Sequence, residues 1–159
     1  MKAGKLFEQE IRNSFRFIDD LWWFRINDHS SYQPFMKKNV PIRIPKTPGD
    51  FFAVYKGIPA LVEAKSSKSA ISYNVSGYIK EHQLEENRNI IKSGGRGWFL
   101  INKRNKPRES QVWYLTAQDI EDLQISKKRK ALKWDDFPPE RELFKIKAGI
   151  WDLMPLFSI

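Results

Sequence analysis

Hydrophobic residues recur at different spacings along the chain, and the spacing predicts where helices and strands lie. Near the start, apolar side chains return every three or four positions with polar residues between them, at Leu6, Phe7, Ile11, Phe15 and Ile18. Such side chains share one face of a helix, so a helix is predicted over residues 5–18. Asp19-Asp20 breaks the pattern, and the aromatic run at residues 21–26 predicts a strand.

Shorter apolar runs predict the remaining strands. Residues 51–55 and 58–64 flank Lys56-Gly57, a pair typical of a tight hairpin turn. Two more strands are predicted over residues 98–101 and 112–115. Before the hairpin, residues 27–48 hold four of the nine prolines, namely Pro34, Pro41, Pro45 and Pro48. This segment is therefore predicted to be a loop or an extended arm.

Three further helices are predicted after the hairpin. Residues 78–93 carry apolar positions at helical spacing, and Gly94-Gly95 ends them because glycine accepts the left-handed cap conformation. Thr116 can cap a short helix that reaches about residue 123. A last amphipathic helix is predicted over residues 141–154. The mixture of helices and strands indicates an α/β fold with a central mixed sheet flanked by helices.

Length and composition exclude several classes of protein. The 159 residues suit a single domain, 1–159. The chain has no cysteine, which excludes disulfide scaffolds, thiolate metal sites and cysteine nucleophiles, and its two histidines argue against a multi-histidine zinc site. No apolar run approaches the roughly 20 residues of a membrane helix, and the polar start resembles no signal peptide. A cytoplasmic protein with no membrane partner is expected.

The charge points to a polyanionic partner. Lys and Arg number 28 against 19 Asp and Glu, a net charge of +9, and the excess gathers in residues 37–68 and 101–133. A compact basic domain of this kind is typical of nucleic-acid binding. The densest run is a candidate for contacts with the DNA backbone: Lys127, Lys128, Arg129 and Lys130. The alternative is a solvated run that keeps the protein soluble.

Candidate chemistry lies around the predicted hairpin. Asp50 precedes its first strand, and Glu63-Ala64-Lys65 ends its second. Glu63 and Lys65 share one face of that strand while Ala64 points into the core, and the strand end is expected to present them at the edge of the sheet beside Asp50. Two converging carboxylates repel unless a hard cation such as Mg²⁺ or Mn²⁺ lies between them. The alternative is an ordinary hairpin with a surface Glu–Lys pair.

These residues resemble the motif of the PD-(D/E)XK nucleases. The surrounding sequence is most similar to the RecU-type Holliday-junction resolvases and more distantly resembles the archaeal Hjc resolvases. Gly4-Lys5-Leu6-Phe7-Glu8 resembles the opening of the first helix in both groups. The stretch from Asp50 to Gly57, running on to Val62-Glu63-Ala64-Lys65-Ser66, resembles the RecU motif, and His82-Gln83 resembles the family's His-Gln pair.

The resemblance implies a restriction-endonuclease-like core and a division of roles. Asp50 and Glu63 would bind Mg²⁺, with Mn²⁺ able to substitute, assisted by the backbone carbonyl of Ala64. Lys65 would activate or orient the attacking water. Glu8 would be a further metal or water ligand, and Gln83 would line the site. The chemistry would be metal-assisted hydrolysis of a phosphodiester that leaves 5′-phosphate ends.

The implied function is a structure-selective DNA endonuclease, a Holliday-junction resolvase. Two symmetric cuts at a four-way junction need two active sites, so a homodimer is expected. Two alternatives stay open, a repair or restriction-type nuclease acting on flaps, ends or duplex, and a non-catalytic basic module that binds nucleic acid. The chain departs from the family at Gly49, where RecU proteins usually carry a hydroxyl residue, and in residues 27–48, which are shorter than the family's projecting stalk.

For two sets of apolar residues, the sequence leaves two possible roles open. Trp22 and Trp23 point to opposite faces of a strand, so at least one is expected in the core, and the other could stack on a base. Near the end of the chain, large apolar residues are candidates either for covering the core or for joining two subunits: Phe144, Ile150, Trp151, Leu153, Met154, Leu156 and Phe157.

Overall fold

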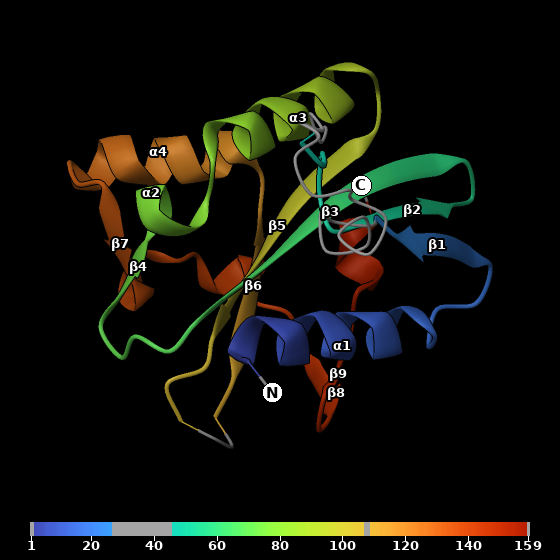
Figure 1. The fold of residues 1–159 in the computed structure, drawn as a ribbon, viewed down its shortest axis with the longest axis horizontal. Coiled ribbons are helices and arrows are strands. Elements are labelled where there is room, and N and C mark those ends of the chain that lie inside the picture. Colours follow the sequence, from blue (N-terminus) through green and yellow to red (C-terminus); the bar gives the residue numbers. More distant parts are fainter. Residues whose placement is uncertain (1, 27–45, 107–108, 159) are drawn as a thin grey trace, which may run out of the picture.

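A five-stranded mixed sheet forms the centre of the protein (Figure 1). The computed structural model describes residues 2–26, 46–106 and 109–158. The strands lie in the order β1-β2-β3-β5-β6, and only β3 and β5 are parallel neighbours. Their bounds are β1 Leu21–Arg25, β2 Phe51–Tyr55, β3 Ile58–Ser67, β5 Arg96–Lys103 and β6 Gln111–Leu115. The predicted central mixed sheet is confirmed.

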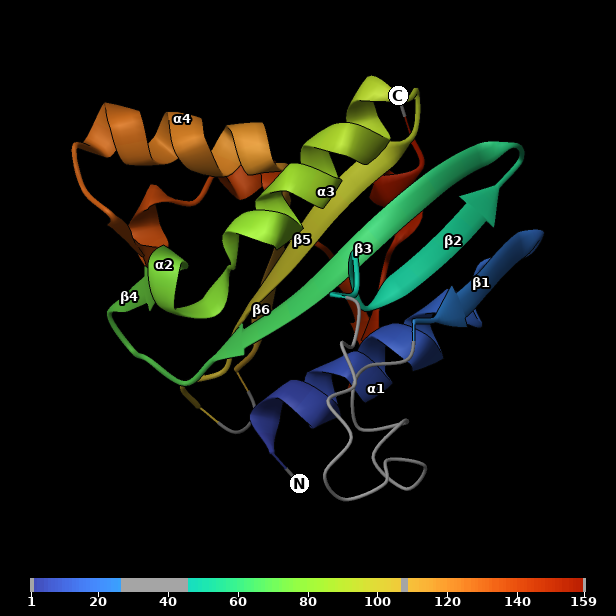
Figure 2. The ribbon, with the colours of Figure 1, turned by 45° about the horizontal axis from the view of Figure 1, so that its top comes forward.

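Helices cover both faces of the sheet. Helix α1 (Ala3–Phe15) packs on one face, where Phe7, Ile11 and Phe15 enter a core shared with β2, β3 and β5. Helices α2 (Val75–Tyr78), α3 (Glu81–Lys92) and α4 (Ala117–Lys127) lie on the opposite face (Figure 2). A second core gathers beneath them around Phe99, Ile101 and other residues of β5 and β6. The two cores fill the space between the sheet and the helices on its two faces.

The hairpin of β2 and β3 forms as its sequence predicts. Phe51 pairs with Val62 and Tyr55 with Ile58, so the turn contains only two residues. Lys56 and Gly57 both have positive φ, 47° and 81°, the combination that a two-residue turn between twisted strands requires. Thr116 also caps α4 as predicted, because its hydroxyl oxygen accepts the Asp119 N–H at 3.0 Å.

The helix predicted over residues 78–93 is wrong at its start. The segment contains the end of the short helix α2 and the whole of α3, and Ile79 and Lys80 between them are extended. Asn74 begins α2 by accepting the Gly77 N–H through its side chain. The Gln83 side chain accepts the Lys80 N–H at 3.0 Å and so begins α3. These side-chain caps, which the apolar spacing does not reveal, divide the predicted helix.

The helix predicted over residues 141–154 is also wrong. This segment forms the hairpin of β8 (Lys145–Lys147) and β9 (Ile150–Trp151), with Gly149 at φ 71° in its turn. The left-handed glycine and the packing of Trp151 under α1 favour the hairpin over the helix. Of the apolar tail residues, Ile150, Trp151, Leu153, Leu156 and Phe157 are buried in this chain, whereas the Phe144 side chain is exposed. The first five therefore cover the chain's own core.

The remaining elements are short. Strand β4 (Ser72–Asn74) pairs with β7 (Ala131–Lys133) beside the second core. Three 3₁₀ helices follow β7 along the chain: η3 (Trp134–Asp136), η4 (Pro139–Arg141) and η5 (Met154–Leu156). Most of the predicted arm, residues 27–45, lies outside the described residues. In the three described ranges, no helix is both long and apolar enough to span a bilayer.

Candidate active site

The predicted catalytic residues meet on the central strand of the sheet. Glu63 and Lys65 lie on β3, which has β2 on one side and β5 on the other. The expectation that they stand at the edge of the sheet is therefore wrong, and Glu63 is only 6% exposed. The reason is the parallel pairing with β5, which continues from Ala60 through Ser67 and joins segments far apart in the sequence. A local pattern does not reveal this partner.

Asp50 is fixed beside β3 by its own backbone. Its N–H donates to the Val62 carbonyl at 3.0 Å, and its carbonyl accepts the Ile26 N–H at 2.8 Å. Its side-chain Oδ2 accepts the N–H of Ala64 at 2.8 Å. The carboxylate therefore lies against the backbone between Glu63 and Lys65, as the hairpin register predicted.

Gly49 allows this close approach. A Cβ atom at residue 49 would lie 3.0 Å from Leu61 Cδ1 and 3.2 Å from the Val62 carbonyl oxygen. Such contacts are tighter than ordinary van der Waals packing, so a hydroxyl residue here would require Leu61 to shift. Glycine therefore fits this position beside the Leu61 side chain.

Two side chains hold the Glu63 carboxylate. The ammonium of Lys65 lies 2.6 Å from Glu63 Oε1, and the amide of Gln83 donates to the same oxygen at 2.6 Å. Gln83 can do so because the break between α2 and α3 places it in the first turn of α3. The same feature that divides the predicted helix therefore brings Gln83 over the centre of the sheet.

The site disfavours negative charge in the absence of a cation. Burial, together with the neighbouring Glu63, raises the pKa of Asp50 to about 7, although the Ala64 N–H and Lys65 oppose the shift. Burial also raises the pKa of Glu63, against the opposing effect of Lys65. Glu8 adds to both upward shifts. Two carboxyl groups with raised pKa values at one point are typical of a functional site that binds positive charge.

Glu8 approaches this centre from α1. Its Oε2 accepts hydrogen bonds from Nε and Nη2 of Arg25 on β1, at 3.2 and 3.0 Å. The other acid of the helix, Glu10, instead binds Arg104 at 2.6 Å and the Trp151 indole at 3.3 Å. Residues two apart on a helix point about 200° apart, so only one of the two acids can face the site.

The donor set fits a hard divalent cation. Among the described residues, no group of three or more acidic or histidine side chains is placed to hold a metal alone. Asp50 and Glu63 could nevertheless supply two carboxylate ligands, and the Ala64 carbonyl could supply a third oxygen donor of a kind that Mg²⁺ accepts. The raised pKa values of both carboxyl groups are the electrostatic sign that a cation is suited to this place.

The sequence did not single out Arg25. Its contact with Glu8 depends on the register of β1 against β2 and on the packing of α1, and no local motif marks it. The basic run occupies a different region, at the end of α4. There Lys127, Lys128 and Lys130 are exposed, and Arg129 binds Asp136 at 3.0 Å. None of the described contacts joins this run to the site.

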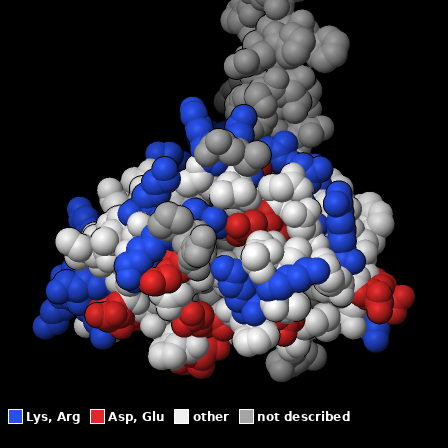
Figure 3. Space-filling model, turned by 90° about the horizontal axis from the view of Figure 1, so that it is seen from below, with Lys and Arg blue, Asp and Glu red and all other residues white. Residues whose placement is uncertain are grey.

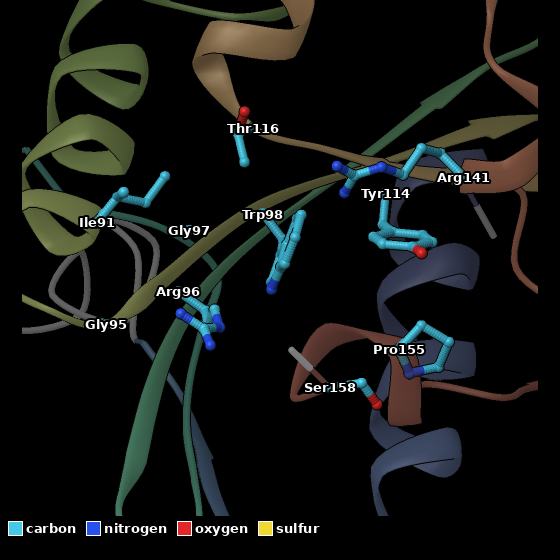
Figure 4. A pocket seen from close by; sticks show the side chains of 10 residues that line it. All are labelled: Ile91, Gly95, Arg96, Gly97, Trp98, Tyr114, Thr116, Arg141, Pro155 and Ser158. Atoms are coloured by element: carbon cyan, nitrogen blue, oxygen red, sulfur yellow. The ribbon is translucent and has the colours of Figure 1, made fainter.

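The surface of the protein has two further features. On the side of the molecule shown in Figure 3, Lys and Arg surround a small acidic area, a pattern that suits a polyanion. A separate pocket of about 610 Å³ lies at the start of β5 (Figure 4), where the Arg141 guanidinium is 5.2 Å from the ring centre of Tyr114. None of the predicted catalytic residues lines that pocket.

Comparisons with known proteins extend over most of the chain. The model of the family described as RecU, recombination protein U, matches residues 31–157. No curated protein matches significantly. Among solved structures, Hjc of Archaeoglobus fulgidus, a Holliday junction resolvase from an archaeal hyperthermophile, is similar with 13% identity. That match covers 74% of this chain and 75% of the other, with a TM-score of 0.46.

Proposed function

The chain belongs to the RecU family of Holliday-junction resolvases, and from this premise we propose how its residues cut a junction. One observation supports the assignment above the others, the convergence of Asp50, Glu63 and Lys65 on one point of β3. Asp50 contacts the peptide N–H that lies between the other two residues, and Lys65 contacts Glu63 directly. Electrostatic repulsion between the carboxyl groups makes this arrangement costly unless a cation binds between them.

Each residue receives a role from its contacts. Asp50 and Glu63, with the Ala64 carbonyl, would hold Mg²⁺ or Mn²⁺, which when bound supplies Lewis-acid activation of the phosphodiester and of water. Lys65 is fixed by Glu63, so its ammonium can orient the attacking water and offset charge developing on the phosphate. Gln83 keeps the Glu63 carboxylate in one orientation. Glu8, which Arg25 holds on the α1 side, would bind a water or the cation.

The direct test uses a synthetic four-way junction and its component duplexes. Incubation with Mg²⁺ should give paired, symmetric nicks in the junction and little cutting of the duplexes, and omission of Mg²⁺ should abolish both. Equal cutting of flaps or plain duplex would indicate a different nuclease specificity. Binding with no cutting under any divalent metal would indicate a non-catalytic module.

Gln83 should have a smaller effect than the acids it supports. Gln83→Ala removes one of the two donors to Glu63 without removing a ligand, so we expect activity at limiting Mg²⁺ to fall by about 10- to 100-fold. Excess Mg²⁺ should restore part of the loss, because the orientation and not the charge of Glu63 has changed. Cleavage rates across a Mg²⁺ titration measure this. A loss that no Mg²⁺ concentration reduces would indicate a direct role in the reaction.

The run of Lys127, Lys128, Arg129 and Lys130 is proposed to contact the DNA backbone. If it does, replacing all four by Ser should reduce the slope of log affinity against log salt by about 0.9 for each phosphate that is no longer neutralised. Preference for the junction over duplex should not change, because phosphate contacts position the protein without specifying the substrate. Because Arg129 also binds Asp136, a variant that keeps Arg129 is the matched control. An unchanged slope would place the run outside the interface.

Two further proposals concern the oligomeric state of the protein and its place in the cell. Two equivalent strands are cut, so we propose that the protein acts as a homodimer with one site in each subunit. Because its substrate is intracellular DNA, we propose that it acts in the cytoplasm.

A further inference from the structure

The pocket at the start of β5 shares no residue with the candidate active site (Figure 4). Segments that lie far apart in the sequence build it, namely the end of α3, the start of β5, the link from β6 to α4, and the 3₁₀ helices η4 and η5. Its volume of about 610 Å³ lies within the range of roughly 300–1,000 Å³ that small-molecule sites occupy. The pocket is therefore large enough for a small ligand.

Packing fixes the aromatic wall of the pocket. The Trp98 indole N–H donates to the Leu156 carbonyl at 2.8 Å, a buried hydrogen bond that holds the end of the chain against β5. The rings of Trp98 and Tyr114 meet edge to face, with their centres 5.2 Å apart. Because both rings are held in this way, the wall is formed before a ligand enters, which lowers the entropy cost of binding.

Two arginines give the pocket its charge. The Arg141 guanidinium lies 5.2 Å from the ring centre of Tyr114 and 5.7 Å from that of Trp98. Arg96 lines the pocket from the first residue of β5. In Figure 4, the two guanidinium groups lie on either side of Trp98. Among the described residues, no Asp or Glu lines the pocket, so its lining attracts anions.

Both guanidinium groups keep hydrogen-bond donors to spare. Within the part of the chain that the structure describes, neither Arg96 nor Arg141 donates a side-chain hydrogen bond. Arg141 Nη2 lies 4.0 Å from Asp119 Oδ2, too far for a hydrogen bond, and that oxygen already accepts the Thr116 N–H. Asp119 thus offsets part of the charge without satisfying the donors. A guanidinium in this state is suited to an oxyanion, which it can bind through two N–H groups at once.

We propose that this pocket binds a nucleotide, a phosphate group with a base attached, either free or at the end of a DNA strand. Arg96 and Arg141 would bind the phosphate oxygens. Ile91 and Pro155 lie on opposite sides of the pocket in Figure 4 and offer apolar surface for the base. Because the pocket and the candidate active site have no residue in common, the proposal does not depend on the nuclease assignment.

The chemistry of the lining favours a nucleotide over an acidic peptide. A phosphate monoester carries a charge of about −1.5 to −2 near pH 7 and three acceptor oxygens, so it can satisfy two guanidinium groups together. Each side-chain carboxylate of a peptide carries a single charge and two oxygens. An acidic peptide would also leave the apolar surface of Ile91 and Pro155 uncovered, whereas a base has a broad apolar face.

The test is calorimetric titration of the full chain, without divalent metal, with adenosine 5′-monophosphate, adenosine and inorganic phosphate. Adenosine 5′-monophosphate should bind. Arg96→Gln and Arg141→Gln should each weaken its binding by about 10- to 100-fold, because each change removes charge-assisted hydrogen bonds to the phosphate. Adenosine and inorganic phosphate should each bind at least about tenfold more weakly than the nucleotide, because each fills only one part of the pocket.

Matched variants separate this site from general charge. Arg16→Gln removes the same charge from an exposed side chain at the end of α1 and should leave nucleotide binding unchanged. Arg141→Lys keeps the charge but loses the two-pronged donor, so it should recover only part of the affinity that Arg141→Gln loses. Thermal melts show whether each variant is folded, and Arg96→Gln tests the pocket without disturbing the contact between Arg141 and the rings.

A single-stranded oligonucleotide, with and without a 5′-phosphate, distinguishes the two sources of the nucleotide. Displacement of adenosine 5′-monophosphate by the phosphorylated strand alone would support a site for strand ends. If neither strand displaces it, a site for a free nucleotide is supported. Displacement by both strands equally would overturn the proposal, because the ligand would then be the backbone of DNA and not a terminal phosphate.

Four other results would also overturn the proposal. Adenosine 5′-monophosphate fails to bind at millimolar concentration, or the folded Arg96→Gln and Arg141→Gln variants bind it like the wild type. Inorganic phosphate binds as tightly as the nucleotide, which would remove the role of the base. An aspartate-rich peptide binds more tightly than the nucleotide and displaces it, which would assign the pocket to an acidic protein segment. A wild type that binds the nucleotide but cuts no junction would support this site and reject the proposed function alone.

Discussion

Replacing Asp50 by Asn, Glu63 by Gln or Lys65 by Ala should lower the rate of junction cleavage by roughly a thousandfold or more. The first two changes remove charge from the proposed metal ligands at nearly constant shape. The third removes the Lys65 ammonium group, which contacts Glu63 at 2.6 Å. Junction affinity should change little, because many Lys and Arg side chains share the phosphates and none of these three residues is needed for that attraction.

The measurement is single-turnover cleavage of a labelled junction, paired with a binding assay on the same protein samples. Glu81→Gln is the matched control, because its carboxylate is 82% exposed on α3 and lies outside the site. It should cut at the wild-type rate. A variant of Asp50, Glu63 or Lys65 that cuts like the control would remove that residue from the proposed machinery. Loss of binding together with cleavage would instead point to a structural role.

The part of the site that lies within one hairpin could be predicted from the sequence. Lys56-Gly57 fixes a two-residue turn, and the turn fixes which residues of β2 and β3 face each other. Asp50, Glu63 and Lys65 then follow by counting along two strands. Their meeting is a local consequence of the sequence, which is why the apolar pattern was sufficient to predict it.

The remainder of the site depends on contacts between distant segments. β3 is central because β5, which lies beyond α3, pairs with it in parallel. Gln83 reaches Glu63 because side-chain caps divide α2 from α3, and Arg25 reaches Glu8 because α1 packs beneath β1 and β2. The tail residues 141–154 form a hairpin because burial of Trp151 outweighs their helical spacing. Long-range packing of this kind overrides local preference and leaves no motif in the sequence.

In EDTA, the Asp50→Asn variant should be as stable as the wild type or more stable at pH 7 and above, and the difference should disappear as the pH falls. The pKa of Asp50 is about 7 in the folded chain, whereas an unfolded aspartate has a pKa of about 3.9. Folding therefore favours the protonated form. Its stabilising contribution is fully present below about pH 4 and is lost as the pH rises through about 7. The wild type should lose up to a few kcal/mol of stability across this window, and Glu63 adds a loss of the same sign.

Mg²⁺ should restore the stability that the wild type loses in EDTA as the pH rises. A cation that binds the folded site and not the unfolded chain stabilises it by about 2.7 kcal/mol at a hundred times its dissociation constant. Most of that gain should be missing in Asp50→Asn. The check is a set of thermal melts of both proteins between pH 4 and 8, in EDTA and across a Mg²⁺ titration.

Asp119→Asn is the control for an acid with a structural role. Asp119 Oδ2 accepts the N–H of Thr116 at 2.8 Å, the same kind of bond that Asp50 Oδ2 accepts from Ala64. It lies at the start of α4, where a negative charge stabilises the helix by about 0.3–1 kcal/mol. Its replacement should therefore lower stability slightly and equally with and without Mg²⁺. If Asp50→Asn behaves in this way, with a clear drop in EDTA and an unaltered response to Mg²⁺, Asp50 is structural and the proposed site loses its first ligand.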